Sequence, residues 1–144
     1  MTFDFRAPRP LAIDHLRWGY LWIGLGCLLV ALIVFLSLIA VPAAVSPFVL
    51  HDKVMHLCAY AAMMGWFAQI FRHDSTRLLL AVGFATLGIG VEFLQALVPA
   101  RQFEVFDMLA NTSGVLLAWA VSYTRFGRIL SGLERWVSRS VSRV

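Results

Sequence analysis

Charged residues are scarce in this chain. Asp, Glu, Lys and Arg make up only 14% of its 144 residues, whereas 60% are hydrophobic, and the mean hydropathy is +0.80. Ordinary soluble domains carry about 25% charged residues and roughly 45 to 50% apolar ones. So little charge excludes an ordinary water-soluble domain, and the composition therefore predicts an integral membrane protein.

Cysteine is also rare, and the common catalytic motifs are missing. Cys27 and Cys58 lie in separate apolar stretches, so we expect small core residues rather than a disulfide framework. The sequence contains no G-x-S-x-G, no H-E-x-x-H and no glycine-rich phosphate loop, which are the signatures of several hydrolase and nucleotide-binding classes. It therefore predicts no cofactor and no dedicated metal site; a mixed site of His56, Glu92 and Asp107 is the metal alternative.

Four apolar segments are candidates for membrane spans. A helix needs roughly 20 apolar residues to cross about 30 Å of hydrocarbon. Pro42 follows the first segment and Pro99 the third, and proline cannot continue a helical hydrogen-bond ladder. Ser46 followed by Pro47 allows an earlier start for the second segment. The sequence predicts an all-α, polytopic membrane protein with four transmembrane helices, over residues 19–41, 53–71, 77–98 and 107–123.

The positions of the basic residues predict which side each loop faces. Lys53 and Arg101 flank the segments on one side, and the other ten of the 12 basic residues, all arginines, flank them on the opposite side. Because Lys and Arg are concentrated in cytoplasmic loops, we expect both termini in the cytoplasm and residues 42–52 and 99–106 outside. This pattern predicts a multi-pass membrane protein with both termini cytoplasmic.

The chain divides into three parts by composition. Residues 1–18 form a cytoplasmic N-terminal segment, 19–124 hold the predicted spans, and 125–144 form a basic tail with five arginines. We expect the tail to be an amphipathic helix on the cytoplasmic surface, with its arginines toward anionic headgroups. Membrane lipids explain this charge more simply than nucleic acid does. The apolar residues of the tail at helical spacing are Phe126, Ile129, Leu130, Leu133, Val137 and Val141.

Polar side chains gather at one end of the predicted spans. One set opens the second segment, another closes the third, and the last leads into the fourth. Spacings of three, four and seven residues place the members of each set on one face of a helix. A charge facing lipid is costly, so we expect the sets to converge on a polar pocket open to the outside. The predicted ligand-binding residues are Asp52, Lys53, His56, Tyr60, Glu92, Gln95, Arg101, Asp107 and Asn111.

These residues carry a resemblance to a known family. The stretches "DKVMHLCAYAAMMG" and "EFLQALVPARQFEVFDMLANTSG" resemble the VanZ-like family of small integral membrane proteins, with the predicted ligand-binding residues and Gly114 in order at the family's spacing. The likeness spans roughly residues 50 to 120. It implies a cell-envelope protein of the bacterial plasma (inner) membrane. Because the founding member is associated with resistance to the glycopeptide teicoplanin, it also implies a link to antibiotic resistance, without a mechanism.

Ligand binding is the first functional hypothesis. The pocket would bind a lipid headgroup, a lipid-linked envelope precursor or the lipid-facing part of a glycopeptide. Arg101 and Lys53 would hold an anionic group, and Glu92 and His56 would orient it. A carboxylate two turns inside a membrane helix needs a cation to stay charged, so we also expect Glu92 and Arg101 to form a coupled pair.

Two other interpretations stay open. In a membrane enzyme, His56 would be the base for acid–base chemistry on a lipid-like substrate, with Glu92 or Asp107 orienting it. In a structural protein, the same side chains would only join helices, at about 0.6 to 2 kcal/mol each. The sequence does not predict the oligomeric state. Glycine allows two helices to approach closely. We expect such close contacts at Gly83, Gly88, Gly90 and Gly114.

Overall fold

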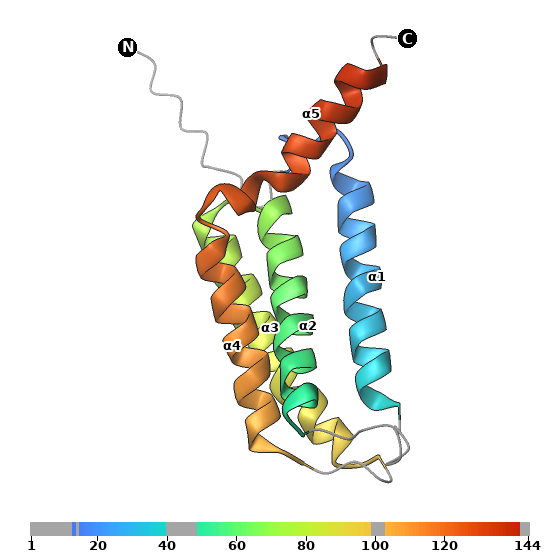
Figure 1. Ribbon diagram of the computed structural model, residues 1–144, viewed down its shortest axis with the longest axis vertical. Coiled ribbons are helices and arrows are strands. Elements are labelled where there is room, and N and C mark those ends of the chain that lie inside the picture. The colour runs from blue at the N-terminus through green and yellow to red at the C-terminus, as the bar shows by residue number, and fades with distance from the viewer. Residues whose placement is uncertain (1–12, 14, 40–48, 99–102, 142–144) are drawn as a thin grey trace, which may run out of the picture.

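The computed structural model describes residues 13, 15–39, 49–98 and 103–141, and all regular structure in them is helical. The all-α prediction is therefore confirmed for this part of the chain. Four long helices run side by side with alternating direction, and a shorter one leaves the bundle at the end where α1 begins (Figure 1). The helices are α1 (Gly19–Leu38), α2 (Val49–Ile70), α3 (Asp74–Gln95), α4 (Val105–Val121), the 3-10 turn η2 (Arg125–Arg128) and α5 (Ile129–Val141).

Two helices are long and apolar enough to cross a membrane by themselves, namely α1 and α3. The helix α4 has only 17 residues, and it passes the same test only together with the helical segment after it, from which it is separated by a 75° bend. The described helices thus offer two or three membrane spans. The four-span count stays a prediction.

The end of α3 differs from the sequence prediction. The helix stops at Gln95 rather than Val98, and the N–H groups of Leu97 and Val98 bond to carbonyls only three residues back, which forms a tight turn. Pro99 explains this early stop, because a residue before proline is disfavoured in the helical conformation. The other signals near these ends, Pro42 and the pair Ser46 and Pro47, lie outside the described residues.

The core lies on α2, which has neighbours on both sides. Tyr60, Met63 and Met64 are fully buried against α3 and α4. At Gly114 of α4, an added Cβ would lie 2.2 Å from the carbonyl oxygen of Leu57 on α2. The two helix backbones therefore touch at this glycine, as the sequence predicted.

The outer surface of the bundle is apolar, and this corrects the expectation for the cysteines. Cys27 and Cys58 are both exposed rather than part of the core. Large apolar side chains of α1 are exposed as well, among them Leu28 at 65% and Phe35 at 62%. In a bilayer the surroundings are as apolar as the core, so hydrophobicity does not separate buried from exposed positions.

The tail helix α5 docks on the bundle through a buried carboxylate. Glu134 is only 5% exposed and accepts hydrogen bonds from the N–H groups of Arg17 (2.7 Å) and Trp18 (3.0 Å). The indole Nε1 of Trp22 donates to it at 2.6 Å. The N-cap residue of α1, Trp18, makes no side-chain cap of its own, so α5 supplies a negative group at the positive end of the α1 dipole.

Replacing Glu134 by Gln should destabilise the protein by about 1–2 kcal/mol, as the loss of a helix cap does. The sequence predicts that the arginine-rich helix α5 lies on the membrane surface, outside the spans. Burial opposes the charge of Glu134, but its hydrogen bonds from Trp22 and the two backbone N–H groups outweigh burial, so the pKa of this carboxyl is lowered. Its stabilising effect should therefore be complete above about pH 4.5 and disappear as the pH falls through the lowered pKa. Thermal unfolding in detergent at several pH values measures this, with the exposed Arg135→Gln as the control; an equal loss in both variants would contradict it.

Candidate functional site: a polar cluster where four helices meet

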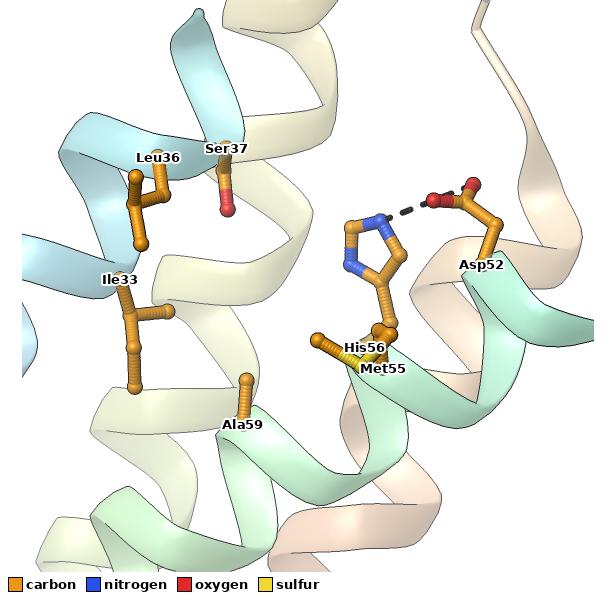
Figure 2. Close-up of a pocket in the computed structure, with 7 residues that line it drawn as sticks. All are labelled: Ile33, Leu36, Ser37, Asp52, Met55, His56 and Ala59. Carbon is orange, nitrogen blue, oxygen red and sulfur yellow. Dashed lines mark ion pairs between the residues drawn. The ribbon is translucent and has the colours of Figure 1, made fainter. Parts of the chain in front are cut away.

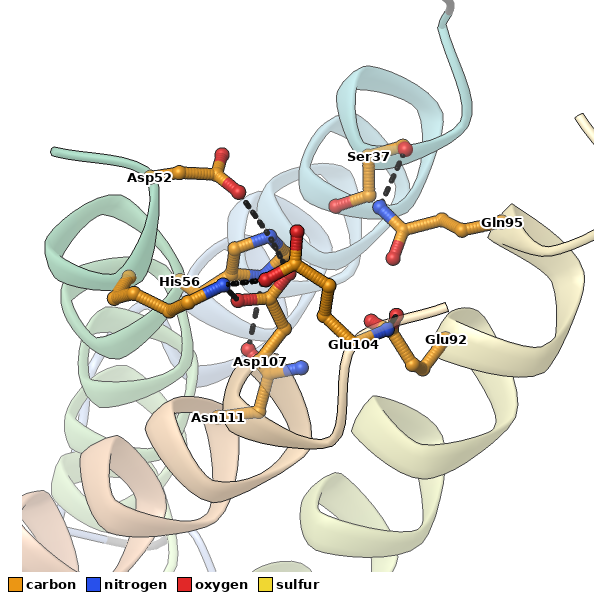
Figure 3. Close-up of polar contacts among 9 residues, drawn as sticks. Ser37, Asp52, His56, Glu92, Gln95, Glu104, Asp107 and Asn111 are labelled. Carbon is orange, nitrogen blue, oxygen red and sulfur yellow. Dashed lines mark hydrogen bonds and ion pairs between the residues drawn. The ribbon is translucent and has the colours of Figure 1, made fainter. Parts of the chain in front are cut away.

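Four helices bring polar side chains together at the end of the bundle opposite α5 (Figure 3). Asp52, Lys53 and His56 open α2, Glu92 and Gln95 close α3, and Asp107 and Asn111 open α4. Ser37 of α1 and Glu104, the N-cap of α4, complete the cluster. Eight of the nine residues predicted from the sequence thus lie within three neighbouring helices at one level. Arg101 lies outside the described residues.

Lys53 is held between two carboxylates. Its Nζ donates to Glu104 and to Asp107 and forms an ion pair with each. Asp107 is the more buried partner, with a side chain that is 7% exposed against 41% for Glu104. The charge of Lys53 is therefore balanced within the cluster and ties α2 to α4.

His56 is oriented by Asn111 and faces two carboxylates. Its Nδ1 lies 3.1 Å from Oδ1 of Asn111, and because a carbonyl oxygen only accepts, Nδ1 carries the proton. Nε2 then points between Asp52 at 4.0 Å and Asp107 at 3.9 Å. The second nitrogen of His56 is thereby available to a molecule that enters between these carboxylates.

Glu92 and Gln95 join α3 to its neighbours. Oε1 of Glu92 accepts the backbone N–H of Glu104 at 2.7 Å, and Nε2 of Gln95 donates to the carbonyl of Ser37 at 2.8 Å. Glu92 is 1% exposed, and its Oε2 and the hydroxyl of the equally buried Tyr60 have no hydrogen-bond partner among the described residues. These contacts stabilise the helix ends, so Glu92 has a structural role beside any role in binding.

A cavity of about 250 Å³ opens between α1 and α2 beside His56 (Figure 2). One part of its wall is polar, formed by Ser37, Asp52 and His56. The rest is apolar and is formed by Ile33, Leu36, Met55 and Ala59. The cavity therefore offers hydrogen-bonding groups at one end and a hydrocarbon surface along α1 and α2, an arrangement that suits an amphiphilic molecule.

The residues that could hold a metal ion differ from those that the sequence suggested. Asp52, His56 and Asp107 each offer one ligand atom, and these atoms lie within 4.8 Å of one another. Glu92, which the sequence placed in such a site, is directed to the backbone of Glu104 instead. Lys53 already forms an ion pair with Asp107, and its positive charge opposes a metal ion there. The donor set therefore suits a polar ligand better than a metal.

Two members of the cluster were missed by sequence reasoning. Glu104 sits three residues before Asp107, at the N-cap of α4, and this acidic N-cap position was the available signal. Ser37 contributes its backbone carbonyl, a group that every residue type carries, so no signal in the sequence identifies it.

The fold and the cluster define a small helical membrane protein with a polar site built from the ends of neighbouring helices. Residues 28–127 match the VanZ/LLP1 family, which covers well over half of the chain. The chain belongs to the VanZ/LLP1 family, and the resemblance seen in its polar residues is confirmed.

One curated relative is similar to part of the chain. An uncharacterized protein of the fission yeast Schizosaccharomyces pombe is 32% identical over 75 residues, which cover 50% of this chain and 46% of the relative. The chain thus aligns with about half the length of that protein. No solved structure shows significant similarity to the chain.

Proposed function

We propose that the protein binds the polar headgroup of a membrane lipid or a lipid-linked molecule in the cavity between α1 and α2. The observation that carries this proposal is the division of the cavity wall, with Asp52 and His56 at the polar end and Met55 and Ala59 along the apolar side. A headgroup at His56 would leave its acyl chain on the apolar wall, in contact with the bilayer.

The charges of the cluster favour a headgroup with hydrogen-bond donors, such as hydroxyl, amide or ammonium groups. Among its described residues, the carboxylates of Asp52, Glu92, Glu104 and Asp107 outnumber the single lysine, Lys53. Lys53 is occupied by two of them, so it is not available to hold an anionic group alone. Arg101, the other cation proposed from the sequence, lies outside the described residues.

The distribution of basic residues supports a location of this site on the outer side of the membrane. Arg72, Arg77, Arg125 and Arg128 lie at the end of the bundle where α1 begins, and Lys53 at the opposite end. Under the positive-inside rule, this arrangement favours cytoplasmic termini and a cluster at the outer leaflet of the plasma membrane. A bacterial envelope role, including one in glycopeptide resistance, is part of the proposal.

An ordinary membrane lipid is the first ligand of this proposal, because the cavity combines a polar end with an apolar wall. A lipid-linked envelope precursor and a glycopeptide are the alternative ligands.

Native mass spectrometry of the purified protein tests the proposal by counting the lipids that stay bound after detergent exchange. Asp52→Asn and Ala59→Phe, which change the polar end and the apolar wall, should each retain the lipid at least about ten-fold less, as expected when about 1.4 kcal/mol of binding free energy is lost. Leu28→Phe, on the exposed face of α1, is the matched control. Equal retention by all of these variants would contradict binding in this cavity.

Acid–base catalysis on the same lipid is the second candidate function. The observation that favours it is the orientation of His56, a residue of the cavity wall whose Nδ1 is held by Asn111 while its Nε2 lies 3.9 Å from Asp107. A histidine fixed in this way can accept a proton from a bound group. Incubation in lipid nanodiscs followed by lipid mass analysis would reveal a product that forms with the wild-type protein and is absent with His56→Gln.

A further inference from the structure

A second polar cavity lies at the opposite end of the bundle, and it is basic. It has a volume of about 230 Å³, and its wall includes Arg72 from the α2–α3 turn, Arg77 from the first turn of α3 and Arg128 from η2. We call this cavity, with its three arginines, the arginine pocket. Arg72 and Arg77 come from one short stretch around the start of α3, whereas Arg128 lies far along the sequence in η2, so the fold brings these two parts together.

Carboxylates of the described residues form no ion pairs with these positive charges. In the described part of the chain, no ion pair involves Arg72, Arg77 or Arg128. Arg72 donates to the hydroxyl of Ser131 at 2.8 Å, which uses one of its five N–H groups. Partial desolvation of its guanidinium and the positive charges of Arg128, Arg77 and Arg135 lower the pKa of Arg72, so an anion placed here would relieve like-charge repulsion.

Arg77 has a structural role within the arginine pocket. It is only 6% exposed and donates to the carbonyls of Ala68 and Phe71 at the end of α2. Its guanidinium lies 5.2 Å from the ring centre of Tyr123, in the range of a cation–π contact. Arg77 therefore adds positive charge from a fixed position, while Arg72 and Arg128, both exposed, are able to reach an anion directly.

An apolar cavity adjoins the arginine pocket. It has a volume of about 270 Å³ and lies between α2 and α4, with Leu117, Val121 and Ile129 in its wall. Ser122 and Gly127 line both cavities, so the two are neighbours. A hydrocarbon-lined space that borders a cluster of arginines has the chemistry of a phospholipid site, because the headgroup carries the negative charge and the acyl chain the apolar surface.

We propose that the arginine pocket binds the phosphate of an anionic phospholipid whose acyl chain lies in the adjoining cavity between α2 and α4. The lipid would belong to the leaflet at the α5 end, so this site is separate from the cluster around His56. Arg72 and Arg128 would hold the phosphate oxygens through charge-assisted hydrogen bonds. The bound lipid would bridge the α2–α3 turn and η2, and would thereby hold the tail on the bundle.

Titration of the full-length protein in detergent with phosphatidylglycerol, monitored by native mass spectrometry, tests the proposal. Arg72→Gln and Arg128→Gln should each weaken binding about ten-fold, as expected for loss of one charge-assisted hydrogen bond. Arg139→Gln removes the same charge from an exposed position of α5 that does not line the pocket and should have little effect. If Arg139→Gln weakens binding as much as the pocket variants, the attraction is diffuse and the proposed site is wrong.

Two further measurements separate a lipid from a soluble phosphate. Val121→Trp, which fills the apolar cavity without touching an arginine, should weaken phosphatidylglycerol binding at least ten-fold, and glycerophosphate, which has the headgroup without acyl chains, should bind at least 100-fold more weakly than the lipid. Equal affinity for glycerophosphate and lipid would show that the pocket takes a soluble phosphate compound and would overturn the proposal. Unfolding midpoints of each variant identify loss of fold, and Val121→Trp keeps the test decisive if an arginine variant unfolds.

Discussion

Replacing Lys53 by Met should destabilise the protein by about 3–5 kcal/mol, the usual cost of removing one partner from a buried ion pair. The side chain of Lys53 is 18% exposed and that of Asp107 only 7%. Without the ammonium group, Asp107 would keep a buried charge without its lysine partner, and one of the contacts between α2 and α4 at this end would be lost. Unfolding by titration of sodium dodecyl sulfate into detergent micelles gives the free energy difference.

A double-mutant cycle provides the control for this prediction. Lys53→Met combined with Asp107→Asn removes both charges, and the double variant should be more stable than the sum of the two single changes predicts, by more than about 0.5 kcal/mol. Glu104→Gln, at the more exposed partner, should have a smaller effect than Asp107→Asn. Additive effects of Lys53 and Asp107 would mean that the pair contributes no coupling energy to the cluster.

Gly114→Ala should destabilise the protein by about 3 kcal/mol, at the upper end of the usual range for overpacking. An added Cβ would lie 2.2 Å from the carbonyl oxygen of Leu57 and 3.0 Å from the backbone nitrogen of Ala61. Backbone atoms of a helix cannot move aside as a flexible side chain does, so α4 would have to move away from α2. The same unfolding titration measures the loss.

Gly83→Ala is the matched control for that change. Outside its own helical turn, no atom of the described residues lies within 4 Å of the position that its Cβ would take, and alanine is favoured over glycine in a helix interior by about 0.5–1 kcal/mol. This variant should therefore be neutral or more stable than the wild type. A similar loss of stability in both variants would contradict the close contact between α2 and α4.

The four glycines show what the sequence could and could not predict about packing. Close approach is confirmed at Gly114 and at Gly88, where a Cβ would lie 3.0 Å from side-chain atoms of Tyr60 and Asn111. At Gly83 and Gly90, outside their own helical turns, no atom of the described residues lies within 4 Å of the position that a Cβ would take, so the prediction was wrong there. Most residues of these helices are apolar or small whichever way they face, so composition does not tell which glycine lies in a helix contact.

The polar cluster was more predictable than the packing, because polar groups in a membrane protein have few places to lie. Alternating helix directions bring the start of α2, the end of α3 and the start of α4 to one level, and this follows from the order of the segments. The pairing within the cluster depends on side-chain reach and could not be predicted. Lys53, for example, pairs with Glu104 and Asp107 rather than remaining available for a ligand.

The predicted pairing of Glu92 with Arg101 involves a residue whose position the structure does not describe. Arg101 lies outside the described residues, so the coupled pair stays a prediction. The observed partner of Glu92 is the backbone N–H of Glu104, a contact that remains when the carboxylate becomes an amide. Glu92→Gln should therefore unfold less readily than Lys53→Met, and the comparison uses the same titration.

Site-specific photocrosslinking tests the central claim, that a lipid headgroup binds beside His56, most directly. A diazirine amino acid placed at Met55 faces the cavity, whereas one at Leu28 faces the outside of α1. After irradiation in native membranes, mass analysis should find one headgroup class enriched at Met55 relative to Leu28, and this enrichment should disappear when His56→Ala is introduced. The same lipid mixture at both positions, unchanged by His56→Ala, would contradict the claim.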